Sequence, residues 1–138
     1  MKKVILSGII AGLLMLIVEF GITGLFGLFP QVNADYHNPS IISAVSGSSI
    51  LTLVVFLYPF ILGIIFSWLW GKSKSLFEGA WIRRGLYFGI VIGFLTLFIF
   101  TIPAAIVSSF SLLTIVSLIV SALFKSMVAG MTFSRMNK

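Results

Sequence analysis

Long apolar runs alternate with short polar stretches along this chain. Four runs, residues 4–29, 48–70, 85–102 and 111–131, consist almost entirely of apolar residues together with glycine, serine and threonine. A helix of about 20 residues crosses a hydrocarbon core about 30 Å thick, and each run reaches about that length. The pattern therefore predicts an all-α protein, a four-helix transmembrane bundle that forms a single integral membrane domain over residues 1–138.

The polar stretches predict how the four helices are connected. Residues 30–46 form a polar outer connection, residues 71–84 a basic one, and residues 103–109 a very short turn. Ser75 and Glu78 have the spacing of a capping box, in which both side chains satisfy free N–H groups at the start of a helix. This spacing predicts a short interfacial helix before the third run.

The composition excludes whole classes of protein. Of the 138 residues, 59% are hydrophobic and 9% are charged, whereas a soluble domain is typically about 45–50% apolar and about 25% charged. A soluble globular enzyme, a disordered chain and a nucleic-acid-binding module are therefore excluded. The sequence has no cysteine and one histidine, His37, so we expect no disulfide, no metal site and no cofactor. The partner that the composition predicts is the lipid bilayer.

Basic residues at the ends of the runs predict the orientation in the membrane. Lysine and arginine are enriched in cytoplasmic connections, and here they lie before the first run, between the second and third, and after the fourth. Both termini are therefore predicted to face the cytoplasm, in a multi-pass protein of the cell membrane. A cleaved signal peptide is the competing interpretation of the first run, but that run contains Glu19 and exceeds the about 7–15 apolar residues of a signal core. The basic residues at these ends are Lys2, Lys3, Lys72, Lys74, Arg83, Arg84, Arg135 and Lys138; the ninth, Lys125, lies inside the fourth run, toward the same end.

One face of each run carries small or polar residues at helical spacing. Residues three and four positions apart share a face of a helix, and small residues let helix backbones approach closely within a membrane. These faces predict compact packing of the four helices with one another. A homodimer or larger membrane complex, with the third run at its interface, is the second arrangement left open. The glycines concerned are Gly8 and Gly12 in the first run, Gly63 in the second, and Gly85, Gly89 and Gly93, two G-x-x-x-G steps, in the third.

Glu19 is the residue that most directly suggests chemistry, because it lies near the middle of the first run. An ionised carboxylate at that depth is costly, and such residues mark functional sites in membrane proteins. A carboxyl group that gains and loses a proton there would suit proton-coupled transport, whereas a permanently protonated one would be a structural hydrogen-bond donor. Lys125 either extends to the headgroups or turns inward toward Glu19. We expect the polar groups at mid-depth, including a carbonyl freed by Pro59, to form one proton or ligand site: Glu19, Tyr58, Pro59, Ser117 and Ser121, with Lys125 as a further candidate.

The outer connection contains Asp35, Tyr36 and His37 next to one another. We interpret them as ordinary solvated residues, not as a metal or ligand site. Asn38 and the proline after it predict a short helix there, because proline suits the first position of a helix. No nucleophile–base arrangement, phosphate-binding loop or dinucleotide fingerprint is present in the sequence, so we do not expect an enzyme.

Short motifs occur over most of the chain. They are Tyr36-His37-Asn38-Pro39, Tyr58-Pro59-Phe60, Trp68-Leu69-Trp70 and Arg84-Gly85-Leu86-Tyr87-Phe88-Gly89. Together they resemble a group of small four-span bacterial and archaeal membrane proteins of unassigned function, and the resemblance implies the fold without an activity. Glu19 alone is similar to the essential glutamate in the first span of the small multidrug resistance transporters, which also have four spans. Those transporters often balance their charges so that antiparallel pairs form, whereas the basic residues here lie on one side.

Two roles follow from these observations. The first is a non-enzymatic membrane protein that serves as a subunit or scaffold and packs through its glycine-rich faces. The alternative is a proton-coupled transporter or channel for a small molecule, with Glu19 at its centre. A cavity that reaches Glu19 favours the transporter, whereas a Glu19 sealed among helices favours the scaffold.

Overall fold

The computed structural model describes residues 2–38, 47, 49–107 and 110–137 of the chain. Within these ranges four helical stretches are long and apolar enough to cross a membrane: α1, Phe56–Leu76, Trp81–Val107 and α7. The prediction of an all-helical protein with four membrane-length helices is confirmed. The short helix expected after Asn38 would occupy residues 39–46, which lie outside the described ones. The elements are α1 (Lys2–Phe26), α2 (Pro30–Tyr36), α4 (Ser49–Ser73), η1 (Lys74–Leu76), α5 (Trp81–Thr96), the π-helical η2 (Leu97–Thr101), α6 (Ile102–Val107) and α7 (Leu112–Met136).

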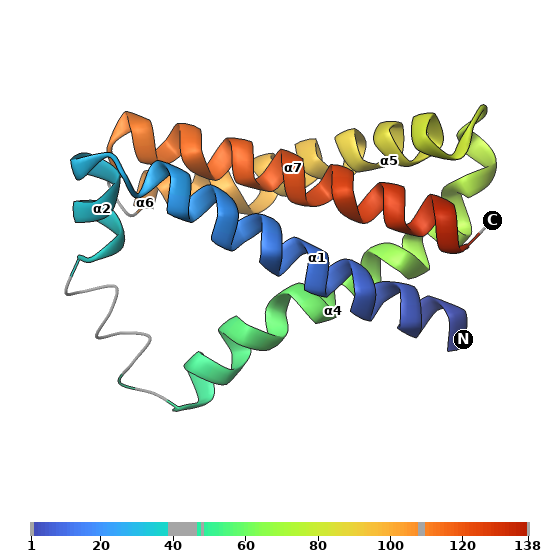
Figure 1. Cartoon of the computed structure of the whole chain (residues 1–138), viewed down its shortest axis with the longest axis horizontal. Helices are drawn as coiled ribbons and strands as arrows, with labels where there is room; N and C mark the ends of the chain where they lie inside the picture. The colour runs from blue at the N-terminus through green and yellow to red at the C-terminus, as the bar shows by residue number, and fades with distance from the viewer. Residues whose placement is uncertain (1, 39–46, 48, 108–109, 138) are drawn as a thin grey trace.

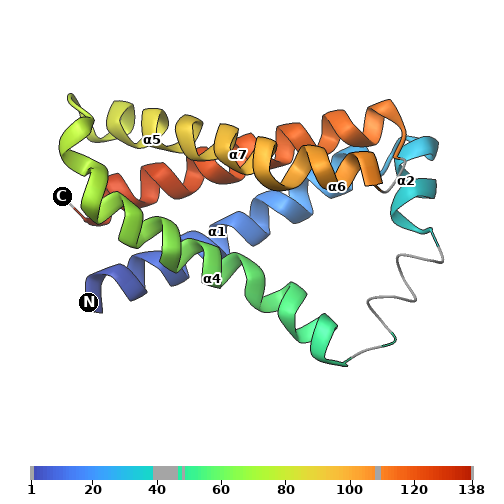
Figure 2. The same cartoon turned by 180° about the vertical axis from the view of Figure 1, so that it is seen from behind.

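The long helices form two antiparallel hairpins that lie side by side. Helix α1 pairs with α4, α5 pairs with α7, and α1 also packs along α7 (Figures 1 and 2). Helix α1 begins and α7 ends at the same end of the bundle, which we call the terminal end; α2 lies at the opposite, distal end. Helix α4 crosses α1 toward the terminal end and then diverges from the other helices, so that its first turns stand apart (Figure 1).

Glycine lets the backbones of α1 and α4 touch where the two helices cross. A Cβ atom at Gly8 would lie 2.6 Å from the Cα of Ile64, and one at Gly12 would lie 2.8 Å from the Cα of Phe60. A Cβ atom at Gly63 would overlap the carbonyl oxygen of Gly8. No side chain fits at these three positions without moving the helices apart, so the crossing depends on glycine in both helices.

The pair α5–α7 is built in the same way. Cβ atoms at Gly85 and Gly89 would each lie 2.6 Å from a Cα atom of α7, in Met131 and Met127 respectively. A Cβ atom at Gly130 would overlap the carbonyl oxygen of Gly85. Gly130 was not among the glycines singled out in the sequence.

The six glycines singled out in the sequence are all buried within the chain. Gly93 completes the set, since a Cβ atom there would lie 3.0 Å from Cδ2 of Leu123 and 3.4 Å from Cβ of Ser126, both in α7. The structure thus places the third-run glycines against α7 of the same chain.

The two hairpins are repeats of one packing unit. Each first helix carries a G-x-x-x-G step, and each second helix carries the pattern G-x-x-F-S, at residues 63–67 and 130–134. Because α1 and α5 both begin at the terminal end, the repeats run in the same direction. The glycine contacts correspond position by position: Gly8 to Gly85, Gly12 to Gly89, Phe60 to Met127, Gly63 to Gly130 and Ile64 to Met131.

The third membrane-length stretch extends further than the sequence indicated. The turn predicted at residues 103–109 is wrong in its first part, because helix continues through Pro103 as far as Val107. Proline normally breaks a helix through its missing N–H group and a clash with the carbonyl four residues earlier. Here η2 precedes the proline, and the N–H of Ile102 bonds to the carbonyl of Leu97, five residues back. The wider π turn makes room for the proline ring.

The connection between α4 and α5 also differs from its prediction. No capping-box helix forms: Ser75 lies in the single turn η1, and α5 begins after Ala80 without a side-chain cap. The ring of Phe77 instead turns inward, with its centroid 6.0 Å from that of Trp70 and 5.8 Å from that of Phe88. Burial of this ring holds the segment extended, and Gly79, with a φ of +106°, ends any helical continuation.

The repeat predicts that substitutions at Gly63 and Gly130 lower the stability of the protein equally. We expect Gly63→Ala and Gly130→Ala each to lower the stability of the protein in detergent by about 1–3 kcal/mol, because the new methyl group separates two backbones. Gly21→Ala is the matched control, since nothing lies within 4 Å of a Cβ atom there. Thermal unfolding of the three variants checks this. Unequal losses at the two glycines, or a loss at Gly21, would contradict the repeat as the basis of packing.

Candidate functional site

An ion pair joins α1 to α7 in the interior of the bundle. The Nζ atom of Lys125 donates to the Oε2 atom of Glu19, and the hydroxyl of Ser121 donates to the same oxygen at 3.2 Å. Ser121 and Lys125 lie one turn apart on the face of α7 along which α1 packs. The structure therefore shows the inward arrangement of Lys125, in which its ammonium group pairs with the Glu19 carboxylate.

The ion pair is accessible from a cavity. The side chains of Glu19 and Lys125 remain 37% and 27% exposed, and both line a cavity of about 610 Å³. The cavity exists because α4, which meets α1 at the glycine crossing, diverges from α7 toward the distal end (Figure 2). Its polar lining comes from five helical elements: Glu19, Tyr58, Thr96, Thr101, Ser121, Lys125 and Ser126.

The cavity collects most of the cluster expected from the sequence. Tyr58 and Pro59 of α4 line it together with Glu19, Ser121 and Lys125. Ser117 does not belong to this cluster. It is buried one turn nearer the distal end, where its hydroxyl lies 3.0 Å from that of Tyr36. Helical spacing correctly placed Ser117 and Ser121 on one face of α7. It could not show that α2 packs over the part of that face nearest the distal end.

The sequence analysis missed three polar residues of the cavity, Thr96, Thr101 and Ser126. The repeat would have pointed to Thr96. Glu19 lies 11 residues after Gly8, and Thr96 lies 11 residues after Gly85. In the second helices, Tyr58 lies 5 residues before Gly63, and Lys125 lies 5 residues before Gly130. All four equivalent residues line the cavity.

The equivalent residues of the two hairpins do not make equivalent contacts. Glu19 and Lys125 meet where α1 packs along α7. The equivalent interface, between α4 and α5, is closed at the terminal end, where the rings of Trp70 and Phe88 meet. Nearer the distal end, Tyr58 of α4 and Thr96 of α5 instead face the cavity. The cavity therefore lies along the open part of the α4–α5 interface.

A polar network closes the terminal end. The hydroxyls of Ser7 and Ser67 lie 2.6 Å apart, and the side-chain amide of Asn137 donates to them at 2.7 and 3.2 Å respectively. The indole N–H of Trp70 donates to the Asn137 carbonyl at 3.2 Å, and its fully buried ring contacts the ring of Phe88 with centroids 5.1 Å apart. These contacts hold α4 against α1, α5 and α7 at this end.

A carboxylate organises the distal end. The Oδ2 atom of Asp35 accepts hydrogen bonds from the Ser111 backbone N–H at 2.9 Å and from the Thr114 hydroxyl at 2.6 Å. Asp35 therefore joins the short helix α2 to the start of α7, which the hydroxyl of Ser111 also caps. Asp35 remains accessible to solvent, but it also has a structural role that the sequence could not reveal, since its partner is a helix start 76 residues later. These hydrogen bonds, from Thr114 first and Ser111 second, hold the pKa of Asp35 below its ordinary 3.8.

Within the described ranges no group of three or more His, Cys, Asp or Glu side chains could hold a metal ion. Comparison of the chain with models of protein families, with curated proteins and with solved structures gives no match.

The lowered pKa of Asp35 predicts how acid affects the distal end. A carboxylate that is stabilised in the folded state contributes stability above its unfolded pKa, and that contribution is lost as the pH falls through the lower folded pKa. We expect the unfolding temperature of the native chain to drop below pH 3.8 and that of Asp35→Asn to be lower already at neutral pH, with a shallower acid limb. Thermal unfolding between neutral and strongly acidic pH checks this. The control is Glu78→Gln, the same chemical change at an exposed site; an acid limb that Glu78→Gln flattens equally would refute the assignment.

The ion pair predicts a positive coupling between its two residues. Lys125→Met leaves Glu19 without its cation, so we expect it to destabilise the protein more than the double variant Glu19→Gln/Lys125→Met does. Partial exposure reduces the effect, and we expect a coupling of about 1–2 kcal/mol. A double-mutant cycle by thermal unfolding in one detergent measures it. Additive losses would show that the two charges are independent.

Proposed function

We propose that this chain is a non-enzymatic multi-pass membrane protein that binds a small amphipathic molecule in the intramembrane cavity and couples its passage to a proton at Glu19. The observation that carries the proposal is the half-accessible ion pair of Glu19 and Lys125 in the wall of that cavity. Residues that serve only to hold helices together need no such access.

The chemistry of the pair supports the coupling. A lone charge inside a bilayer is costly, and pairing lowers that cost. Of the two groups, only the carboxylate is neutralised by taking up a proton, because the lysine ammonium group is neutralised by losing one. When Glu19 takes up a proton, Lys125 loses its counter-charge, and an anionic group of a ligand can take the vacated place. The site would then accept one proton with each anion, so that the number of charges in the cavity is unchanged.

The rest of the lining supports an amphipathic ligand. Aromatic side chains surround the polar groups, among them Phe20, Phe56 and Phe66. A volume of about 610 Å³ falls within the about 300–1,000 Å³ of small-molecule sites, which are also mostly apolar with a few polar groups. An apolar body with one anionic group matches this combination.

The orientation expected from the basic residues adds a direction to the proposal. With the terminal end in the cytoplasm, the polar network around Asn137 closes the inner side, and the diverging half of α4 opens the cavity on the outer side and toward lipid. The described structure would then correspond to an outward-open state.

A role as a subunit or scaffold is the other proposal that the sequence suggested. It relied on glycine faces, and six of those glycines are buried inside the chain. A subunit role would therefore need a different surface, and we place it second.

The test is the protonation of Glu19 in lipid nanodiscs, followed by infrared difference spectroscopy with octanesulfonate as the anionic amphipathic probe. We expect a carboxyl band that exchanges rapidly in D2O and grows at constant pH when the probe is added. Glu19→Gln should abolish the band, and Glu78→Gln should leave it.

Two outcomes would overturn the proposal. A Glu19 band that neither titrates nor exchanges would make the residue a structural strut. A band that titrates without responding to octanesulfonate would separate proton binding from anion binding and remove the proposed coupling.

A further inference from the structure

The open part of the α4–α5 interface has a closed counterpart in the same chain. Because the two hairpins are repeats, the interface of α1 with α7 corresponds to that of α5 with α4. We call the first the closed interface and the open part of the second the open interface. In the closed interface, Glu19 of α1 contacts Ser121 and Lys125 of α7. These contacts show what the open interface would form if α4 moved against α5.

The residues of the open interface suit such a contact. The equivalents of Glu19, Ser121 and Lys125 are Thr96, Val54 and Tyr58, respectively. The Thr96 hydroxyl donates to the carbonyl of Ile92 at 2.8 Å, so its oxygen can still accept a hydrogen bond from Tyr58. A neutral hydrogen bond between α4 and α5 would then take the place that the ion pair has in the closed interface.

A proline lies where α4 leaves the bundle. Pro59 is inside α4, and its carbonyl oxygen would lie 3.0 Å from a Cβ atom at Gly12, within the glycine crossing. Proline has no N–H to bond the carbonyl four residues earlier, so a helix bends more easily there. The equivalent residue of α7 is Ser126, and α7 is one continuous α-helix against both α1 and α5. The two second helices therefore differ at the residue from which α4 diverges.

The other wall of the open interface is irregular as well. Helix α5 ends at Thr96, and the chain continues as the π-helical η2. The equivalent residues of α1, 20–24, lie within a regular α-helix. Among the four membrane-length stretches of the described chain, the irregular ones are thus the two that border the open interface. Single π turns are frequent at functional sites.

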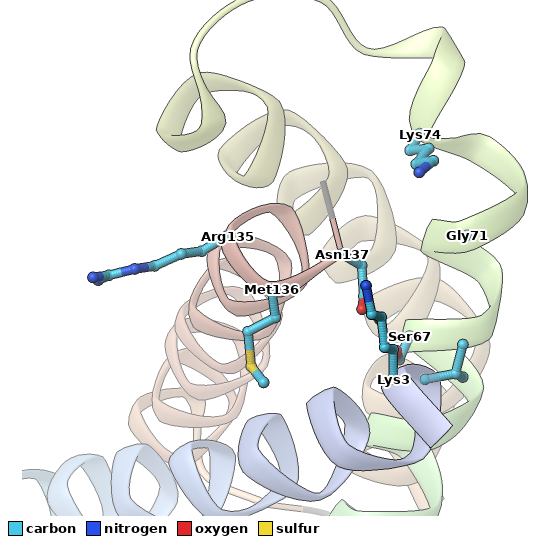
Figure 3. Close-up of a pocket in the computed structure, with 8 residues that line it drawn as sticks. Lys3, Ser67, Gly71, Lys74, Arg135, Met136 and Asn137 are labelled. Atoms are coloured by element: carbon cyan, nitrogen blue, oxygen red, sulfur yellow. Dashed lines mark hydrogen bonds between the residues drawn. The ribbon is translucent and has the colours of Figure 1, made fainter. Parts of the chain in front are cut away.

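Contacts at the terminal end hold the second half of α4 in place. Figure 3 shows Ser67 of α4 beside Asn137, whose side-chain amide donates to the Ser67 hydroxyl at 3.2 Å. Ser67 and Trp70 are fully buried, and Gly63 contacts the backbone of α1. Pro59 lies one turn before Gly63, so it separates this fixed half from the half that stands apart in Figure 1.

We propose that the first half of α4, residues 49–58, turns about Pro59 and packs against α5 as α1 packs against α7. In this closed state Tyr58 and Val54 lie against Thr96, and the cavity is covered on the side that α4 leaves open. Closure of this kind follows from the repeat and the two irregular helices. It needs neither a ligand nor a proton, so it goes beyond the proposed function and is tested without them.

The test uses the absence of cysteine from the sequence, since two introduced cysteines are then the only thiols. The full chain with Val54→Cys/Thr96→Cys, in lipid nanodiscs without ligand, is treated with a short bifunctional methanethiosulfonate. Intact-mass spectrometry follows the fraction of chains in which one linker joins both thiols. Val54 lies in the half of α4 that stands apart, so we expect a link to form as that half moves against α5. Thermal unfolding shows that the variant is folded.

The matched control is Leu53→Cys/Thr96→Cys. Leu53 precedes Val54 and is also exposed, but successive residues of a helix point about 100° apart, so closure does not bring Leu53 to Thr96. We expect the control to link several-fold more slowly. Equal rates for the two pairs, or no link with Val54→Cys/Thr96→Cys, overturn the proposal. Neither result depends on the infrared response of Glu19, so the proposed function is judged separately.

Pro59→Ser tests the hinge, because it gives α4 the residue that α7 has at the equivalent position. The restored N–H group completes the helix, and a straight α4 would stay against its neighbours as α7 does. In the Val54→Cys/Thr96→Cys chain we therefore expect Pro59→Ser to speed linking several-fold. A rate that is unchanged or lower would show that α4 does not turn about Pro59, which overturns the proposed closure.

Discussion

Contact between helix backbones at glycine is the constraint on which the rest of this structure depends. Inside a bilayer, apolar side chains gain nothing by leaving lipid for another helix, so close approach of backbones has to supply the attraction. This close approach occurs twice with the same arrangement: a G-x-x-x-G step in α1 or α5 packs against a single glycine in α4 or α7, respectively. Each crossing fixes two helices at one level and leaves their far ends unconstrained.

What happens at the far ends distinguishes the two hairpins. Helix α5 stays against α7 along its length, whereas α4 leaves the bundle beyond its crossing with α1. The space so formed is bordered by the polar pair of Glu19 and Lys125 on one side and by Tyr58 on the other. The cavity thus forms because the second helix of one hairpin diverges while that of the other does not. Residues at equivalent positions of the two hairpins supply polar groups to it.

The sequence was sufficient for the parts of the structure that depend on local patterns. Hydropathy predicted the four long helices, and helical spacing put Glu19, Ser121 and Lys125 on inward faces. The sequence could not predict contacts between distant segments. The role of Asp35 depends on the start of α7, which lies beside it only in the folded chain. Phe77 does not continue the expected helix because its ring packs against the rings of Trp70 and Phe88.

The distance along the chain between the members of the ion pair has a consequence for biogenesis. Glu19 and Lys125 are separated by 106 residues, and a ribosome makes the chain from its N-terminus. The carboxyl group of Glu19 is therefore made long before the cation that pairs with it, and the ion pair forms only once α7 has been made. A chain truncated before Lys125 would carry Glu19 on its first long apolar helix without this partner.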